Sequence, residues 1–271
     1  MRETLMGKGE MGRAVFDFSA TTTVITGGVS GIGLACAELI ARCGGDVVVS
    51  AHRRPDGGVD AAKVDSALER IRAAAGPAPS TVTALGCDVG DEASVAAFFR
   101  QVPHVDYLIH SAGVSPNTAF LDQTGHEWDT VHNVNTTGAF LVTKHAALAM
   151  ERNPLQGDFR GRILLITSTN GINSQDPVSA HYDSSKAAAN MVVRTAAERL
   201  AEMRICVNGL APGWINTEMN ATLPPDLRER ESARIWMRRW ADPEEVARCA
   251  AHLLTMPYLM GQVVMVDGGY R

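Results

Sequence analysis

The chain has 271 residues, of which 45% are hydrophobic, and this is enough for one large α/β domain with a sizeable core. Its formal net charge is −5, so the composition does not indicate a nucleic acid or an anionic membrane as a partner. The sequence contains no apolar run of the ~18 residues that a membrane span needs. The five cysteines are scattered and the eight histidines lack ligand spacing, which predicts a reduced, cytoplasmic protein without a bound metal.

The first predicted unit is a strand, a glycine turn, a helix and a second strand. Residues 1–19 before it show no strong period and are expected to form a flexible arm, whereas 20–271 should form a single domain. Strands are predicted at 22–25 and 46–50, with the turn at 26–33 and a helix that ends at 43–45. The glycines of such a turn let the backbone approach a pyrophosphate, and the helix start offers free N–H groups. This order favours nucleotide binding over a turn that merely connects two elements.

Further apolar runs predict five more strands, at 80–85, 105–110, 162–167, 205–210 and 262–266. A helix is expected from Tyr182 to Met203. Another begins after Asp242, which has the character of an N-cap because Pro243 and, at the third position, Glu245 follow it. The segment 219–240 carries arginines and glutamates of mixed sign, which favours a solvated helix face over an anion-binding site.

Tyr182 and Lys186 stand four residues apart in one predicted helix, so both side chains should lie on the same face. A nearby ammonium group favours the phenolate and lowers the pKa of a phenol. A tyrosine brought from a pKa of ~10 to near 7 needs roughly 4 kcal/mol of differential stabilisation, for which a second positive charge such as an oxidised nicotinamide would help. Such a phenol can exchange a proton with an alcohol or a ketone. On spacing alone, a surface pair is the simpler interpretation.

The glycine turn and the tyrosine–lysine pair together point to one family. Thr26-Gly27-x-x-x-Gly31-Ile32-Gly33 with Tyr182-x-x-x-Lys186 resembles the short-chain dehydrogenase/reductase family, in its compact single-domain branch, from about residue 20 to the C-terminus. The resemblance implies a three-layer, doubly wound Rossmann fold, an α/β architecture in which helices cover both faces of a seven-stranded parallel sheet. It also implies reversible hydride transfer between a nicotinamide cofactor and a carbonyl or secondary alcohol.

The same resemblance implies a catalytic tetrad of Asn135, Ser168, Tyr182 and Lys186. Tyr182 is expected to be the general acid in reduction and the base in oxidation, with Lys186 lowering its pKa and binding the nicotinamide ribose. Ser168 would donate a hydrogen bond to the substrate oxygen. Asn135 would hold a water that links Lys186 to solvent.

Cofactor-binding residues follow from the family at the positions that match its motifs. One stretch departs from the pattern, because His110-Ser111-Ala112-Gly113 stands where the family usually has Asn-Asn-Ala-Gly. The complete set expected to bind the cofactor is Gly27, Ser30, Gly31, Ile32, Gly33, His52, Arg53, Asp88, Val89, Ser111, Ala112, Tyr182, Lys186, Pro212, Gly213, Ile215 and Thr217.

The end of the second strand bears on the choice between NADP(H) and NAD(H). An acidic residue there would bind both ribose hydroxyls and repel a 2′-phosphate. The position is Ala51, and His52, Arg53 and Arg54 follow it, so a charge-assisted pair with the phosphate is available. Against this, Ser30 stands where many NADP-preferring relatives carry a basic residue, and the arginines could be merely solvated. The sequence favours NADP(H) and leaves NAD(H) open.

The resemblance leaves the substrate open and favours NADPH-dependent reduction of a 3-oxoacyl, cyclic or polyketide-like ketone. The residues expected to line its pocket, under a mobile flap at 219–240, are Val114, Asn170, His181, Trp214 and Met219, with Ser115, Ile172, Asn173 and Val178 as further candidates. The alternatives are an NAD-dependent secondary alcohol dehydrogenase and a non-catalytic nucleotide sensor, although a sensor would be expected to lack the tyrosine or the lysine. The family also implies a homotetramer, built on the Tyr182 helix, the helix before it and the last strand.

Overall fold

A seven-stranded parallel sheet forms the centre of the computed structural model, which describes residues 15–271 except 55, 78–79, 174–178 and 222. The strand order is β3-β2-β1-β4-β5-β6-β7, so the chain reverses its direction of growth between β1 and β4. The strands are β1 (Thr22–Thr26), β2 (Asp46–His52), β3 (Val82–Cys87), β4 (Tyr107–His110), β5 (Gly161–Ile166), β6 (Ile205–Pro212) and β7 (Val263–Val266). The predicted Rossmann-type fold is confirmed, with small shifts at the strand ends.

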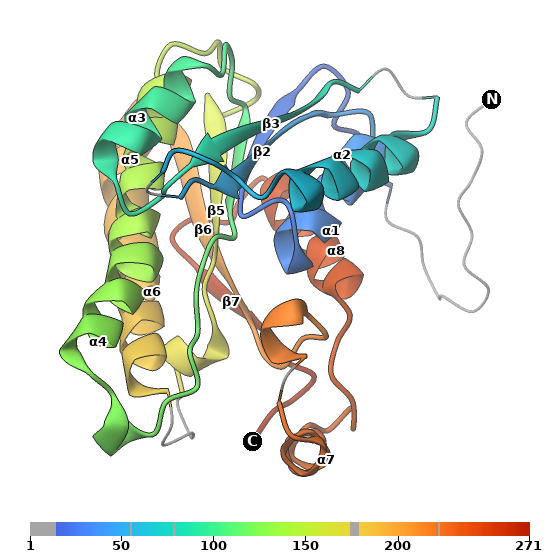
Figure 1. Ribbon diagram of the computed structural model, residues 1–271. Helices are drawn as coiled ribbons and strands as arrows, with labels where there is room; N and C mark the ends of the chain where they lie inside the picture. Colours follow the sequence, from blue (N-terminus) through green and yellow to red (C-terminus); the bar gives the residue numbers. More distant parts are fainter. Residues whose placement is uncertain (1–14, 55, 78–79, 174–178, 222) are drawn as a thin grey trace.

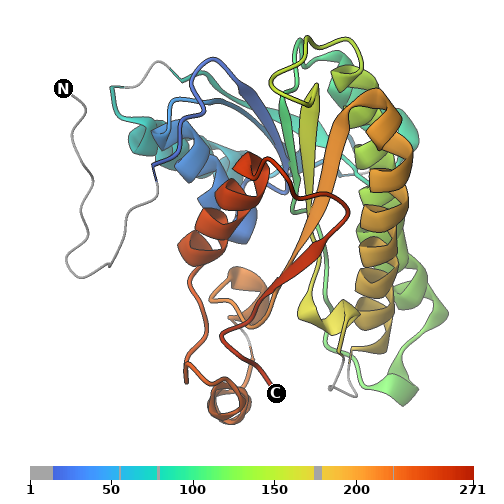
Figure 2. The same cartoon turned by 180° about the vertical axis from the view of Figure 1, so that it is seen from behind.

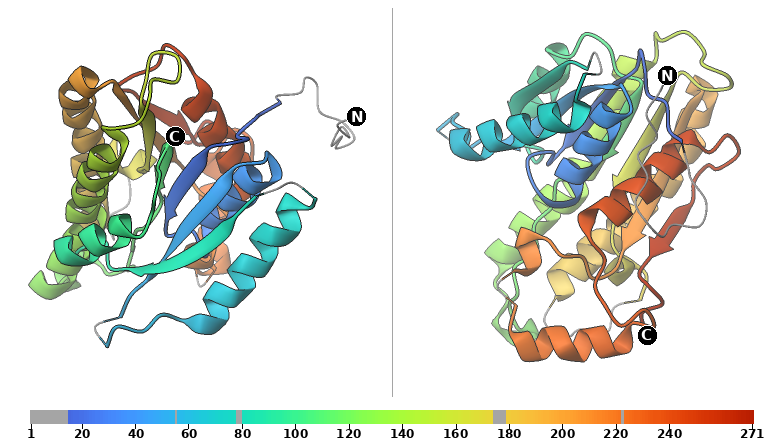
Figure 3. Two further views of the ribbon diagram at one scale, coloured as in Figure 1. Left: turned by 90° about the horizontal axis from the view of Figure 1, so that it is seen from above. Right: turned by 90° about the vertical axis from the view of Figure 1, so that its right-hand side faces the viewer.

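Helices cover both faces of this sheet (Figures 1 and 3). One layer holds α1 (Gly31–Arg42), α2 (Ala61–Ala75) and α8 (Pro243–Thr255), and the other holds α3 (Glu92–Arg100), α5 (Gly138–Met150) and α6 (Ala180–Leu200). The helix α4 (Gly125–His132) leads through a π-helical segment (Asn133–Thr137) into α5. None of the described helices is both long and apolar enough to cross a membrane.

The core consists of two apolar layers, one on each face of the sheet. Ile25 of β1 and Ile109 of β4 pack toward α1 and α8, whereas their neighbours Val24 and Leu108 pack toward α5 and α6. Successive side chains of a strand point to opposite faces, and a parallel sheet covered on both sides therefore needs apolar residues at adjacent positions. This explains why the strands read as continuous apolar runs.

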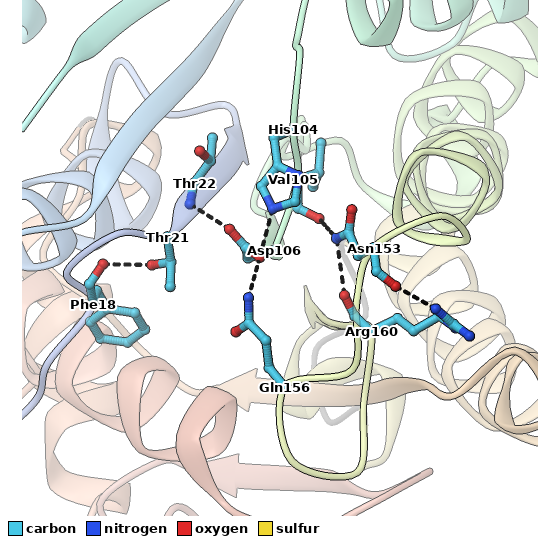
Figure 4. Close-up of polar contacts among 9 residues, drawn as sticks. All are labelled: Phe18, Thr21, Thr22, His104, Val105, Asp106, Asn153, Gln156 and Arg160. Atoms are coloured by element: carbon cyan, nitrogen blue, oxygen red, sulfur yellow. Dashed lines mark hydrogen bonds and ion pairs between the residues drawn. The ribbon is translucent and has the colours of Figure 1, made fainter.

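A buried carboxylate joins the strands at the edge where β1 and β4 begin (Figure 4). Asp106 accepts hydrogen bonds from the backbone N–H of Thr22 at 2.8 Å and from the side chain of Gln156 at 2.8 Å, and it contacts the ring of His104 at 2.9 Å. This polar network lies at the amino end of the strands. The opposite, carboxyl edge is thereby left for binding, as is usual in open α/β sheets.

The last residues of the N-terminal arm expected at 1–19 belong to the folded domain. Residues 1–14 lie outside the described residues, but Phe18 is fully buried in the core, and its N–H donates to the carbonyl of Cys43 at 3.0 Å. Two phenylalanines, Phe16 and Phe18, in a segment without a longer period were too weak a signal to predict this burial.

The segment expected to be a flap contains the helix α7 (Pro225–Arg234), which lies beside the C-terminus (Figure 2). Its side chain Glu231 is buried and accepts a hydrogen bond from the Tyr270 hydroxyl at 2.5 Å and an ion pair from Arg234 at 3.1 Å. Ile235 and Tyr270 also form an antiparallel bridge. The helix is therefore held by the C-terminal residues rather than standing free.

Candidate active site

The glycine turn between β1 and α1 forms one wall of the site. Gly27 has φ of +67°, and a Cβ there would lie 2.8 Å from the Cα of Ala112, so this position requires glycine. Ser30 precedes α1 in an extended conformation, and its side chain makes no capping hydrogen bond. The N–H groups of the first helical turn are therefore available to an anion, which suits a pyrophosphate.

His110 braces the end of β4 against the end of β1. It stands opposite Thr26 in the parallel register, and its Nδ1 lies 2.7 Å from the Thr26 hydroxyl oxygen. The ring is buried, and its Nε2 has no hydrogen-bond partner among the residues that the structure describes. Burial, assisted by the charge of Lys186, lowers the pKa of His110 to about 3. The histidine is thus a neutral strut between the glycine turn and the strand that ends in Ser111 and Ala112.

This buried ring predicts an acid-sensitive stability. Because the pKa of His110 falls from 6.5 to about 3 on folding, the unfolded chain binds the additional proton between these values, and stability is lost as the pH falls through this window. Between pH 7 and 5 the loss from this group is about 2 kcal/mol, at 1.36 kcal/mol per pKa unit. Urea unfolding at both pH values measures this loss. In His110→Asn, the free energy of unfolding should fall by about 2 kcal/mol less between pH 7 and 5 than in the wild type. The exposed His52→Asn serves as control, and an unchanged pH dependence in His110→Asn would refute the assignment.

The side chains of Ser168, Tyr182 and Lys186 come together at the carboxyl edge of β5. Ser168 follows this strand and is hydrogen-bonded to Tyr182, whereas Tyr182 and Lys186 lie on the first turns of α6. The Lys186 Nζ lies 5.6 Å from the centroid of the tyrosine ring and donates to the carbonyl of Ile166 at 3.1 Å. Gly171 lets the segment after β5 pack closely on the backbone of α6, because a Cβ there would lie 2.5 Å from the backbone carbonyl carbon of Lys186.

The electrostatics of the pair differ from the expectation based on its spacing. Burial raises the pKa of Tyr182 above its ordinary value, the charge of Asp183 raises it further, and only the hydrogen bond with Ser168 opposes them. Burial also lowers the pKa of Lys186 to about 8. The predicted lowering of the tyrosine pKa by the lysine is therefore wrong for the protein without a bound cofactor, because the cost of burying the phenolate dominates.

Asn135 lies in the π-helical segment between α4 and α5 and is buried. Its Oδ1 accepts from the N–H of Val114 at 2.9 Å, and its Nδ2 donates to the carbonyl of Val114 at 2.9 Å and to the Ser185 hydroxyl at 3.0 Å. π-bulges are frequent at functional sites. The side chain thus ties the loop after β4 to α6, one residue before Lys186.

A cavity of about 200 Å³ joins these parts. The predicted residues that line it are Gly27, Ser30, Gly31, Ile32, Ser111, Ala112, Ser168, Tyr182, Lys186, Pro212, Gly213, Ile215, Thr217 and Met219. The arrangement places a run of backbone N–H groups at one end and three proton-bearing side chains at the other. This fits an elongated dinucleotide whose reactive ring meets a small substrate.

Other predicted residues lie outside the lining of this cavity. Asp88 and Val89 follow β3, and His52 and Arg53 are exposed where β2 ends, toward the edge of the sheet. Gly33 lies inside α1, where it packs against the glycine turn. Asn135 supports the cavity from behind, as described above.

Most residues expected to contact substrate also lie beside the cavity rather than in it. Val114 is bound by Asn135, Asn170 donates to the carboxylate of Asp183 at 2.8 Å, and His181 is fully buried, where its Nδ1 accepts from the N–H of Tyr182 at 2.8 Å. Trp214 does not line the cavity and stacks on Trp240 at 4.9 Å between ring centroids. Ser115, Ile172 and Asn173 do not line it either. Val178 lies outside the described residues.

Comparison with known proteins agrees with this geometry. A family model described as "Enoyl-(Acyl carrier protein) reductase" matches residues 27–271. "Glucose 1-dehydrogenase 2" of Bacillus subtilis is 32% identical over 257 residues, which cover 93% of this chain and 95% of the relative. The 3-oxoacyl-(acyl-carrier-protein) reductase of Thermotoga maritima is 32% identical over 254 residues, which cover 91% and 96%. The chain belongs to the short-chain dehydrogenase/reductase family.

Solved structures of this family have the same fold. A short-chain type dehydrogenase/reductase from Mycobacterium marinum superimposes with a TM-score of 0.83 at 28% identity, covering 94% of this chain and 97% of the other. The protein is therefore a short-chain oxidoreductase that uses a nicotinamide cofactor and acts on a hydroxyl-bearing or carbonyl carbon.

Some residues of the site did not emerge from the sequence. Gly113, Ile166, Thr167, Glu218 and Asn220 also line the cavity. Gly113 and Thr167 adjoin recognised motifs, which is a signal that could have found them. Glu218 likewise adjoins the recognised motif that ends at Thr217, and only the fold brings it to Lys63 of α2, with which it forms an ion pair at 2.6 Å.

Proposed function

We propose that this protein reduces a ketone with NADPH, and that Asn135, Ser168, Tyr182 and Lys186 carry out the proton chemistry. The observation that supports this most is the meeting of Ser168, Tyr182 and Lys186 in the cavity that the glycine turn also lines. A phenol with a raised pKa stays protonated at neutral pH, which suits a proton donor. The names of several relatives specify 3-oxoacyl substrates, so a 3-oxoacyl thioester is the first ketone to test.

In the reduction, a bound nicotinamide would supply the hydride to the carbonyl carbon. The hydroxyl of Ser168 donates a hydrogen bond to the carbonyl oxygen, which stabilises the developing alkoxide. Tyr182 transfers its hydroxyl proton to that oxygen, so the product is a secondary alcohol and the tyrosine is left as phenolate. The Lys186 ammonium then offsets this charge, and a proton returns to Tyr182 from solvent along Lys186 and the segment held by Asn135.

Turnover of acetoacetyl-coenzyme A and of a set of cyclic ketones, followed by the loss of nicotinamide absorbance, tests this proposal. We expect reduction with NADPH. Oxidation of secondary alcohols with NAD⁺, without reduction of any ketone, would instead identify an alcohol dehydrogenase. Cofactor binding with no turnover in either direction would identify a nucleotide sensor.

The preference for NADPH is supported by the surroundings of the β2 end. His52, Arg53 and Arg54 are exposed there, and Ala51 leaves no carboxylate at the strand end. The nearest acidic groups along the chain are engaged in turns, since Asp56 accepts from the N–H of Gly58 and Asp60 caps α2. A 2′-phosphate at this edge would meet guanidinium groups without a repelling carboxylate at the strand end.

We therefore expect NADPH to bind at least about tenfold more tightly than NADH, which corresponds to roughly 1.4 kcal/mol. Arg53→Gln should remove most of this ratio by weakening NADPH alone, whereas Arg100→Gln, an exposed arginine at the end of α3, should not change it. Fluorescence titration with both cofactors on one preparation measures this. Equal or tighter binding of NADH would mean that the arginines are only solvated and would direct the search toward alcohols.

A homotetramer is also part of the proposal. Phe140 and Leu148 of α5 and Met191 of α6 are exposed apolar side chains, and so are Met265 of the edge strand β7 and Trp236. Exposed apolar patches of this kind often mark subunit contacts. Light scattering should give four times the chain mass of 29.0 kDa. Phe140→Asp should reduce the assembly to a smaller species, and a monomeric wild-type protein would contradict the assignment. The free cysteines fit the cytoplasm as its compartment.

A further inference from the structure

The chain after β6 separates two cavities. Gly213, Ile215 and Thr217 line the cavity of about 200 Å³ that is proposed to hold the cofactor, called the cofactor cavity below. The residues between them, Trp214 and Asn216, do not line it. Trp214 stacks on Trp240, and Asn216 lines a second cavity of about 390 Å³. Residues of α7, of the connection after it and of the start of α8 line this second cavity, and the right-hand view of Figure 3 shows these two helices.

The walls of this second cavity are rich in arginine. Arg228 of α7 and Arg238 and Arg239 of the connection to α8 line it, together with Ser232 and Asn216. The two carboxylates in its wall already have partners. Glu245 forms two hydrogen bonds of 2.7 Å with Arg239, and Asp242 accepts from the Asn216 side chain at 2.8 Å and forms a capping box with Glu245.

Among the described residues, Arg228 and Arg238 in contrast have carbonyl oxygens as their acceptors. Arg228 donates to the Asn216 Oδ1 at 2.5 Å and lies over the ring of Trp240 at 4.2 Å from its centroid. Arg238 donates to the backbone carbonyl of Ala233. Within the described part of the chain, neither arginine takes part in an ion pair. Two guanidinium groups that form no ion pair among the described residues thus face one concave space, whose wall also contains Asp242 with neutral hydrogen-bond partners.

The frame that carries these arginines is well ordered by packing. Glu231 anchors α7 to Tyr270, and Trp240 is almost fully buried beneath Arg228. A guanidinium held over an aromatic face loses less conformational freedom on binding a ligand than a freely solvated one. The arginines of 219–240 are exposed or partly exposed, in agreement with the expected solvated face, and among them the fold separates those with acidic partners from these two.

We propose that this cavity is a binding site for a phosphate group, held by the guanidinium groups of Arg228 and Arg238. A phosphate monoester carries about two negative charges near neutral pH and several acceptor oxygens, which match two guanidinium forks. One residue links the two cavities. Arg228 donates to Asn216, whose neighbours Ile215 and Thr217 line the cavity proposed for the cofactor.

Calorimetric titration with inorganic pyrophosphate in the presence of saturating NADPH tests the site, since the cofactor then blocks the glycine turn. We expect binding that persists with NADPH and weakens at least about tenfold in the double variant Arg228→Gln/Arg238→Gln. Arg230→Gln is the matched control, because Arg230 lies on the same helix and does not line the cavity. Circular dichroism establishes that all variants are folded.

Three results would overturn the proposal: no binding, binding that NADPH abolishes in wild type and double variant alike, or equal weakening in the Arg230→Gln control. The proposal does not depend on the reaction. Should NADPH itself fail to bind, the proposed function fails, but pyrophosphate binding without cofactor still reports on this cavity through the two variants.

The phosphate can belong to a free metabolite or to the carrier of the substrate. The KM values of acetoacetyl-coenzyme A and acetoacetyl-N-acetylcysteamine, which share the reacting ketone, distinguish these sources. A lower KM for the coenzyme A ester that is lost in the double variant assigns the carrier. An unchanged ratio of KM values, together with lost pyrophosphate binding, assigns a free phosphate compound.

Discussion

Replacement of Tyr182 by phenylalanine should lower the rate of ketone reduction by about 10³-fold, within the range that a positioned proton donor contributes. The phenol is the proposed acid, and it is hydrogen-bonded to Ser168. Phenylalanine keeps the ring that Lys186 faces at 5.6 Å, so the packing and the dissociation constant of NADPH should change little. Steady-state kinetics and a cofactor titration on the same preparation measure both quantities.

Tyr258→Phe is the matched control, because this tyrosine is fully exposed and has no lysine four residues after it. It should leave kcat unchanged. If Tyr182→Phe retained more than about a tenth of the activity, the proton would have to come from another group or from water, and the assigned role would be wrong.

Replacement of Gly33 by alanine should weaken cofactor binding at least about tenfold and lower the free energy of unfolding by about 2 kcal/mol, in the range of overpacked sites. An added Cβ would lie 2.3 Å from the carbonyl oxygen of Gly27 and 2.9 Å from its carbonyl carbon. Either α1 or the glycine turn must then move, and the N–H groups at the helix start move away from a bound pyrophosphate. Urea unfolding and NADPH titration check the two effects.

Gly125→Ala provides the comparison, since the first position of α4 has open space around a Cβ. Alanine there should be neutral or slightly stabilising, because it restricts the unfolded chain. A Gly33→Ala protein with wild-type stability and affinity would show that the turn is more adaptable than its close contacts indicate.

Short-range patterns predicted the parts of the site that lie within one element. The four-residue spacing of Tyr182 and Lys186 placed both on one face of α6, and the glycine turn before α1 followed from its position between a strand and a helix. The capping box of Asp242 and Glu245 was likewise legible from the sequence and is formed. Each of these features depends on local geometry, which the order of residues specifies directly.

The direction of the Tyr182 pKa could not be predicted in this way. Spacing identifies the lysine as a neighbour, but the burial that raises the phenol pKa arises from elements across the whole chain. The same holds for Trp214, whose stacking partner Trp240 follows α7 in the chain. Which side of the 213–217 segment faces the cofactor cavity depends on that packing and not on the residue types.

The sequence by itself determined the fold, the family and the identity of the proposed catalytic side chains, because apolar runs and glycine positions encode strands and turns locally. Only the tertiary structure decided how these groups are tuned and what surrounds them. His110 became a strut for Thr26 through strand register. Among the described residues, Arg228 and Arg238 form no ion pair, whereas Glu231 and Glu245 pair with other arginines. Burial and charge pairing are sums over residues distant in the chain, so they take definite values only when the chain is folded.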